Sequence, residues 1–130
     1  MSASIVDSEI LIDILNGMPD ALTWLETMPA MAITPINWFE VMAGARRYDE
    51  SRRRQTTRFL AAFEMLYVTE ADQSWAMDAF RRYTPEFGVK WTDILIASVC
   101  VRLGTTLYAR DNHFSIIPEL TVRSPYHTGE

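Results

Sequence analysis

Four carboxylate side chains, from four separate parts of the chain, are the residues best suited to carry chemistry in this sequence. Asp7, Glu40, Asp93 and Asp111 each lie near a junction between a short apolar segment and a helical pattern. Carboxylates that converge repel one another unless a cation lies between them, and such hard oxygen ligands suit Mg²⁺ or Mn²⁺. A carboxylate-bound ion of this kind can hold a phosphate oxygen and deliver an activated water to phosphorus. The four residues are therefore candidate metal ligands for phosphoester chemistry.

Each of these residues also has an ordinary structural explanation. Asp7 and Asp93 stand where an aspartate often caps a helix. Asp111 is followed by Asn112, a pair typical of a turn after a strand, and Glu40 is compatible with an exposed helix residue. The sequence leaves these explanations open, and the grouping of all four acids at strand ends favours the metal site.

Short apolar strands that alternate with helices must position these carboxylates. The pattern predicts strands at residues 4–6, 31–34, 66–68, 105–108 and 120–122. It predicts helices at residues 10–15, 19–28, 36–44, 49–63, 72–83 and 91–103. No hairpin signal separates the strands, so the pattern indicates an α/β domain around a parallel sheet. In such sheets ligands bind beyond the carboxyl ends of the strands, where the four acids are expected.

Length and composition limit the class of protein. The 130 residues, 48% hydrophobic and 22% charged, are expected to form a single domain over 1–130 with a polar tail over about 124–130. The one cysteine, Cys100, has no partner within the chain and indicates a reducing compartment. No apolar run is long enough to span a bilayer and no signal region opens the chain, so we expect a cytoplasmic protein without a membrane partner. The net charge of −5 argues against a protein that coats nucleic acid.

Basic residues are concentrated in one segment. Half of the twelve basic residues are arginines between positions 46 and 58. One interpretation is a solvated helix face, paired with Asp49, Glu50 and Glu64. The other is a phosphate-binding surface, which arginine suits through its bidentate geometry.

The four acidic segments, in this order, resemble the PIN-domain nucleases and in particular the VapC-type toxins of toxin–antitoxin pairs. Residues 6–13 (VDSEILID) resemble the first acidic motif of that family, and residues 32–45 resemble its strand-and-helix segment with a glutamate. Residues 91–98 (WTDILIAS) resemble the third motif. Residues 107–114 and 117–120 resemble the fourth motif and the segment that follows it. The resemblance covers almost the whole chain.

The resemblance implies a PIN-like three-layer α/β/α domain with a central, mostly parallel sheet. It implies that Asp7, Glu40, Asp93 and Asp111 form an acidic pocket for one or two Mg²⁺ or Mn²⁺ ions. Members of the family cut RNA, are usually homodimers, and are silenced by an antitoxin that inserts a segment at the pocket. The resemblance therefore implies a metal-dependent endoribonuclease, with RNA as substrate and a cognate antitoxin as partner.

Two positions depart from the family pattern, and several others are candidate RNA contacts. Glu9 stands where Asn or Asp is common but remains an oxygen ligand, and Ala109 replaces a threonine. An acidic pocket repels RNA, so basic groups near it must hold the phosphates. The candidate contacts are two hydroxyls, which could instead support the metal ligands, and four arginines: Ser8, Thr34, Arg46, Arg47, Arg54 and Arg110. Trp38 and Trp91 are expected to pack in the core rather than to stack on bases.

Two other classes of protein share part of this pattern. A phosphate-accepting receiver domain also places acids at strand ends, but it needs a lysine after a late strand, and the sole lysine, Lys90, precedes a helix. The second alternative is a catalytically silent PIN-like module that only binds RNA or protein. The presence of all four acids argues against a silent module.

Overall fold

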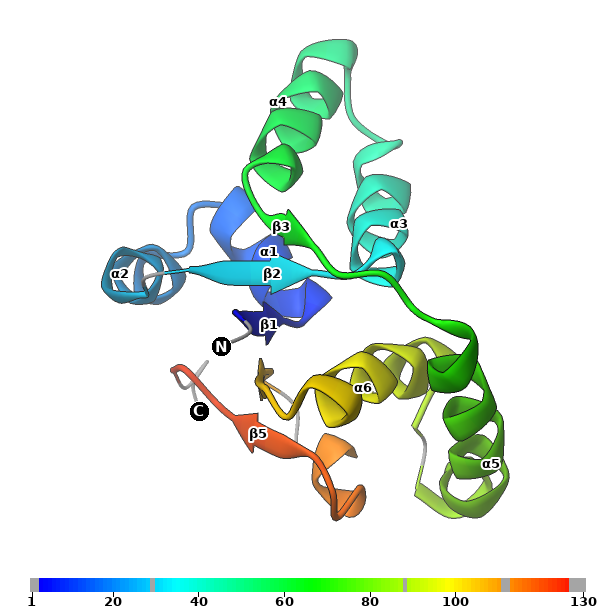
Figure 1. The fold of residues 1–130 in the computed structure, drawn as a ribbon. Helices are drawn as coiled ribbons and strands as arrows, with labels where there is room; N and C mark the ends of the chain where they lie inside the picture. The colour runs from blue at the N-terminus through cyan, green and yellow to red at the C-terminus, as the bar shows by residue number, and fades with distance from the viewer. Residues whose placement is uncertain (1–2, 29, 88, 111–112, 127–130) are drawn as a thin grey trace.

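The strands form one parallel sheet that brings the acidic segments to a common edge. The computed structural model describes residues 3–28, 30–87, 89–110 and 113–126. Its sheet has the order β3-β2-β1-β4-β5, with every pairing parallel (Figure 1). The strands are β1 (Ser4–Val6), β2 (Met31–Ile33), β3 (Glu64–Met65), β4 (Thr106–Tyr108) and β5 (Thr121–Arg123).

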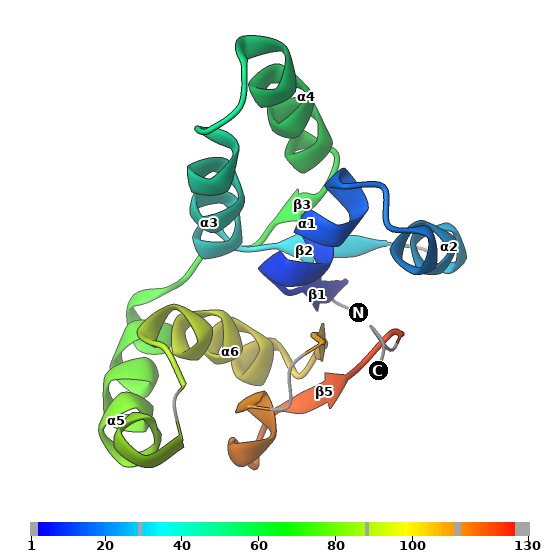
Figure 2. The same cartoon turned by 180° about the vertical axis from the view of Figure 1, so that it is seen from behind.

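Helices connect these strands. They are α1 (Ser8–Leu15), α2 (Pro19–Thr27), α3 (Pro35–Ala45), α4 (Glu50–Ala61), α5 (Glu70–Phe87) and α6 (Trp91–Leu103), and a 3₁₀ turn spans His113–Ile116. The α3–α4 pair projects beyond the β3 edge of the sheet (Figure 2). No helix in the described residues is both long and apolar enough to cross a membrane.

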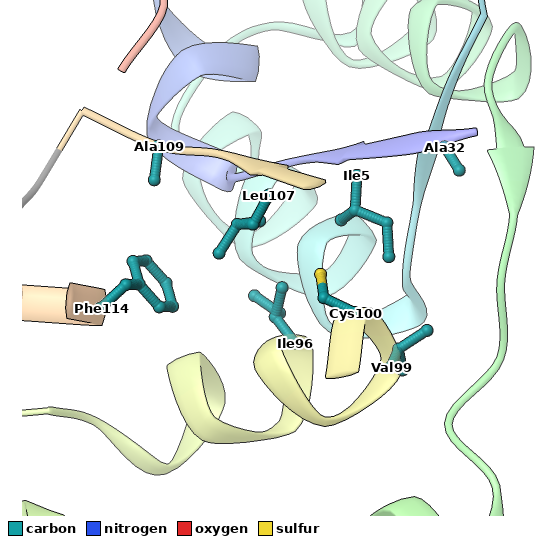
Figure 3. Close-up of a cluster of buried hydrophobic side chains, with 8 residues drawn as sticks. All are labelled: Ile5, Ala32, Ile96, Val99, Cys100, Leu107, Ala109 and Phe114. Carbon is teal, nitrogen blue, oxygen red and sulfur yellow. The ribbon is translucent and has the colours of Figure 1, made fainter. Parts of the chain in front are cut away.

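Neighbouring residues of each strand point to opposite faces of the sheet and so fill two separate cores. Ile5 and Leu107 pack with Val99 and Cys100 of α6 on one face (Figure 3). Val6 packs on the other face with residues of α1, α2, α3 and α4. Helix α5 packs on the outer side of α6, in a third cluster. This arrangement confirms the predicted α/β/α fold with a parallel sheet, in which Cys100 is a buried free thiol.

The predicted strand at 66–68 is wrong by two residues. The paired strand is Glu64–Met65, which lies beside Ala32 and Ile33. The Leu66 N–H still donates to the carbonyl oxygen of Ile33 at 2.9 Å, and the apolar run beyond it marks burial, because Leu66 and Val68 pack against the core.

Helix ends differ from the predicted ones where a cap decides them. α5 begins at Glu70 rather than residue 72, because Thr69 and Asp72 exchange capping hydrogen bonds of 3.0 Å. α6 ends as predicted at Gly104, which adopts φ 64°. In α2 Ala21 is fully buried, while the larger Leu22 is 40% exposed.

Candidate active site

Asp7 is fixed at the carboxyl end of β1 by the central strand pairing. Its backbone N–H donates to the carbonyl oxygen of Tyr108 at 2.8 Å, which continues the β1–β4 pairing. The side chain is buried, with 5% of its surface exposed, and makes no hydrogen bond that caps α1. Asp7 therefore occupies the N-cap position of α1 without the side-chain hydrogen bond that the capping explanation requires.

Asp93 lies in the first turn of α6 and is also buried. Its Oδ2 accepts a hydrogen bond from the backbone N–H of Lys90 at 3.3 Å. The capping explanation therefore holds for one oxygen of Asp93, and this bond fixes the direction of the carboxylate. The same carboxylate acts electrostatically on Asp7.

Glu40 reaches the end of β1 from helix α3. It is half-buried, and its Oε1 accepts a hydrogen bond of 2.5 Å from the hydroxyl of Ser8. Because Ser8 directly follows Asp7, this bond joins the middle of α3 to the beginning of α1. Glu40 is thus held by a specific partner and is not an unconstrained surface residue.

The electrostatics of Asp7 show that these acids converge. The pKa of Asp7 is raised to about 7, mainly by burial and next by the charge of Asp93. Glu9 and Glu40 also raise this pKa, while a hydrogen bond from the Ser8 backbone lowers it. The fold therefore brings together three of the four predicted acids, and Glu9 with them. Asp111 lies outside the described residues.

The donor chemistry of this cluster fits a hard divalent cation. Carboxylate oxygens are the preferred ligands of Mg²⁺ and Mn²⁺, and a buried carboxylate among like charges gains most from a cation. Within the described ranges, however, no three acidic, histidine or cysteine side chains already stand close enough to hold one ion together. The two observations agree, because charge repulsion acts over longer distances than metal–ligand bonds.

Ser8 and Thr34, two predicted RNA contacts, both have hydrogen-bond partners inside the protein. Thr34 is fully buried and caps α3 in a reciprocal arrangement with Asn37. The Asn37 side-chain N–H donates to Ser8 Oγ at 3.1 Å. Asn37 was not singled out from the sequence. Its spacing from Thr34, three residues, is the capping-box signal that could have found it.

Arg110 forms ion pairs with two acidic side chains of α1. It pairs with Glu9 at 3.6 Å and with Asp13 at 3.2 Å. Asp13 also accepts a hydrogen bond of 2.8 Å from the hydroxyl of Tyr126. Burial raises the pKa of Tyr126, as does its bond to Asp13. Arg110 is therefore part of a polar link between α1, the end of β4 and the C-terminal segment.

The arginine segment is divided between internal and exposed roles. Arg54 pairs with Glu50 at 3.1 Å on an exposed face of α4. Arg52 donates to Asn16 at 2.9 Å, and its guanidinium lies 4.7 Å from the ring centre of Tyr48. The other two predicted contacts are exposed at the end of α3 and have no ion pair with any described residue: Arg46 and Arg47.

An apolar groove lies between α5 and α6, beside the first turn of α6. It has a volume of about 790 Å³. Its lining includes Met77, Phe80 and Trp91, which are 69%, 42% and 61% exposed. The expectation that Trp91 packs in the core is therefore wrong, whereas Trp38 packs against the α1–α4 core.

The fold is shared with several solved toxin–antitoxin proteins. A chain of a toxin–antitoxin complex from Klebsiella pneumoniae is 29% identical, with a TM-score of 0.80, over 97% of this chain and 99% of that one. A chain of DNA-bound VapBC from Salmonella typhimurium is 18% identical, with a TM-score of 0.79, over 97% and 100%. VapC20 of Mycobacterium tuberculosis, described as a sarcin-ricin loop cleaving toxin, is 18% identical, with a TM-score of 0.77, over 94% and 100%.

Sequence comparison identifies the family independently of the structure. No curated protein sequence gives a significant match. The family model described as the PIN domain matches residues 4–120, a range that includes all four predicted acids. The chain belongs to the PIN-domain family.

Proposed function

We propose that the protein is a metal-dependent endoribonuclease that hydrolyses RNA phosphodiesters. The observation that carries this proposal is the buried carboxylate of Asp7, whose pKa of about 7 reflects burial and the neighbouring charges of Asp93, Glu9 and Glu40. A cluster of this kind is unfavourable in a protein unless a cation compensates it. Its place at the carboxyl end of a parallel strand is the usual ligand-binding place of this fold class.

Asp7 and Asp93 are the proposed direct ligands of Mg²⁺ or Mn²⁺, with Glu40 and Asp111 completing the shell directly or through water. A bound divalent ion would supply charge neutralisation at the phosphate and a water of lowered pKa. The protein itself contributes orientation: the Lys90 N–H fixes Asp93, and the Ser8 hydroxyl fixes Glu40. Burial of Asp7 excludes competing water from its carboxylate.

Arg46 and Arg47 are the proposed main phosphate contacts. Both are exposed, and Arg46 follows Glu40 on α3 by six residues, about 9 Å along a helix axis. Arg54 and Arg110 would have to exchange a carboxylate partner for a phosphate, so we expect them to contribute less. Ser8 and Thr34 would act on RNA only indirectly, since their hydroxyls are buried and bonded.

The biological role we propose is that of the toxin in a toxin–antitoxin pair. The 29% identity to a chain of a toxin–antitoxin complex, over nearly the full length of both chains, supports this role. The cognate antitoxin would present a basic side chain to the acidic pocket, where a guanidinium pairs with two carboxylates. Its RNA substrate would place the protein in the cytoplasm.

A homodimer that forms through the α5–α6 groove is also part of the proposal. A two-fold contact sets one patch against itself, and apolar surface together with charges of both signs makes a patch self-complementary. The groove offers exposed Met77 and Phe80, and nearby Asp78 pairs with Arg81 at 3.3 Å and Arg82 at 3.0 Å. These ion pairs are exposed and can exchange partners with those of a second copy.

Incubation of the purified protein with labelled RNA tests the nuclease directly. Cleavage should require Mg²⁺ or Mn²⁺ and stop when a chelator is added. Asp93→Asn keeps the shape and the capping acceptor but removes one charge, so we expect cleavage to fall by at least ~100-fold, about 2.7 kcal/mol of transition-state stabilisation. Asp20→Asn, an exposed acid of α2, is the matched control and should cleave normally. A wild-type protein that binds RNA without cutting it would instead identify a silent PIN-like module.

A further inference from the structure

A chain of buried hydrogen bonds leads from the start of α3 to the carboxylate of Glu40. Thr34 donates twice to Asn37 Oδ1, from its backbone N–H at 2.8 Å and from its hydroxyl at 2.9 Å. Asn37 Nδ2 donates to Ser8 Oγ at 3.1 Å, and Ser8 Oγ donates to Glu40 Oε1 at 2.5 Å. These four residues lie on two helices and at the end of β2. Each hydrogen bond of the chain is donated in the same direction, from Thr34 toward Glu40.

The direction of this chain is determined by its first bond. The backbone N–H of Thr34 can only donate, so the side-chain oxygen of Asn37, and not its nitrogen, must face it. The Asn37 nitrogen is then the atom that faces Ser8, and it can only donate. Because the Ser8 hydroxyl accepts this bond, its single proton is free to point at Glu40.

The residues of this hydrogen-bond chain are buried, so the protein and not the solvent supplies their hydrogen-bond partners. Asn37 and Thr34 are fully buried, and 6% of the surface of Ser8 is exposed. Water therefore cannot replace a donor that is lost from the chain, and a buried polar chain acts as a unit. The other oxygen of Glu40 receives no hydrogen bond from the described residues.

We propose that Asn37 is a positioning residue, which acts through Ser8 to hold the Glu40 carboxylate with one oxygen bonded and the other presented to the site. Asn37 itself touches neither metal nor substrate in this proposal. The inference rests on the proposed function in that Glu40 is taken as part of the metal shell. It assigns to Asn37 a second role beyond capping α3.

Asn37→Asp separates the two roles. Aspartate is nearly the same shape and still accepts from Thr34, so the cap of α3 should be retained, while the added buried charge should lower the melting temperature. An ionised aspartate cannot donate to Ser8, whose proton is then shared between two carboxylates. We expect kcat for RNA cleavage to fall about tenfold with KM within about twofold of wild type, and the Mn²⁺ concentration for half-maximal activity to rise.

The Ser8→Ala background distinguishes positioning from the added charge of the aspartate. If Asn37 acts through Ser8, then Ser8→Ala alone lowers kcat by a similar factor, and adding Asn37→Asp to it lowers kcat little further. Ser8→Thr keeps the hydroxyl and should recover most of the kcat that Ser8→Ala loses. An Asn37→Asp variant with wild-type kcat, or an equal loss with and without Ser8, would overturn the proposal.

A spectroscopic measurement keeps the inference testable without catalysis. In a ¹⁵N–¹H spectrum the side-chain amide signals of Asn37 should shift in Ser8→Ala and remain near their wild-type positions in Ser8→Thr. If the wild-type protein cleaves no RNA with either metal, the proposed function fails, and this spectrum still decides the hydrogen-bond chain. Asn37 signals that ignore Ser8→Ala would overturn it.

Discussion

Asp7 is the residue whose environment departs most from that of an ordinary surface acid. Its backbone is fixed by the β1–β4 pairing and its carboxylate is buried among other carboxylates. Such a residue lowers the stability of the metal-free fold at neutral pH, because the folded protein must either keep a proton or hold an unfavourable charge. The site is in this sense organised for a cation at the expense of stability.

The pH dependence of unfolding should report this cost. The pKa of Asp7 is raised from 3.8 in the unfolded chain to about 7 in the fold, so the folded state binds the proton more tightly. Its contribution to stability is fully present below pH 3.8 and is lost as the pH rises through about 7. We therefore expect the free energy of unfolding, measured with urea in chelator, to fall by up to about 4 kcal/mol from this residue between those pH values.

Asp7→Asn is the matched variant for this measurement. It keeps the shape but does not titrate, so its unfolding free energy should lack this pH-dependent loss and exceed that of wild type at pH 8. Parallel pH profiles of the two proteins would refute the raised pKa.

The sequence predicted the individual residues of the site unevenly. Asp7, Asp93 and Glu40 could be found because acids at strand and helix junctions are visible in the pattern, and the fold then brings them together. Asn37 could not be ranked in this way, because its link to Ser8 depends on how α1 and α3 pack. The ion pairs of Arg110 with Glu9 and Asp13 likewise depend on how the elements pack. The sequence could not show that Arg110, predicted as a phosphate contact, already has acidic partners.

At the scale of elements, local sequence signals predicted the helices and the order of the strands along the chain. The exact ends of the strands depend on how the strands pair in the sheet. Thr34, Asp49 and Gly104 mark helix ends through local chemistry that is readable in the sequence. The strand near residue 65 was misplaced because apolarity reports burial, whereas membership of the sheet depends on partners in β2. Short strands are especially prone to this error, since two residues carry no periodicity.

The connection between α3 and α4 is the element that we expect to hold RNA. Replacement of Arg46 and Arg47 by alanine should raise KM severalfold and leave kcat nearly unchanged. If each contacts one phosphate of single-stranded RNA, the slope of log affinity against log salt should become shallower by about 1.4. Salt titrations of RNA binding, with a catalytically inactive background, measure this slope.

Arg81→Ala supplies the control for the RNA measurement. Arg81 is an exposed arginine of α5, and its ion pair with Asp78 is a surface pair of small energetic value. It should leave the salt slope unchanged. An unchanged slope in the Arg46 and Arg47 variant as well would leave the arginine segment as a solvated face.

At the scale of the whole molecule, the fold leaves a large apolar groove between two helices. The groove between α5 and α6 contains Trp91, two residues before Asp93. The sequence did not reveal this surface, because Met77, Phe80 and Trp91 have the same types as core residues.

A double substitution tests the dimer. Met77→Lys with Phe80→Lys places two like charges in the groove, which then face a second copy of themselves across the two-fold contact. We expect sedimentation equilibrium to show a dimer for wild type and a monomer for this variant, with little change in melting temperature since both side chains are exposed. Leu22→Lys, at an exposed leucine of α2, should remain dimeric. A dimeric groove variant would place the interface elsewhere.

The measurement that tests the acidic metal pocket most directly is a melting series on wild type, Asp7→Asn and Asp93→Asn, each in chelator and with Mn²⁺. Without metal, both variants should melt above wild type, against the usual destabilising effect of substitution, because each removes one of several repelling charges. With Mn²⁺, wild type should gain stability by mass action, and both variants should lose most of that gain. If both variants melt below wild type in chelator and wild type does not respond to Mn²⁺, the carboxylates are structural and the metal pocket does not exist.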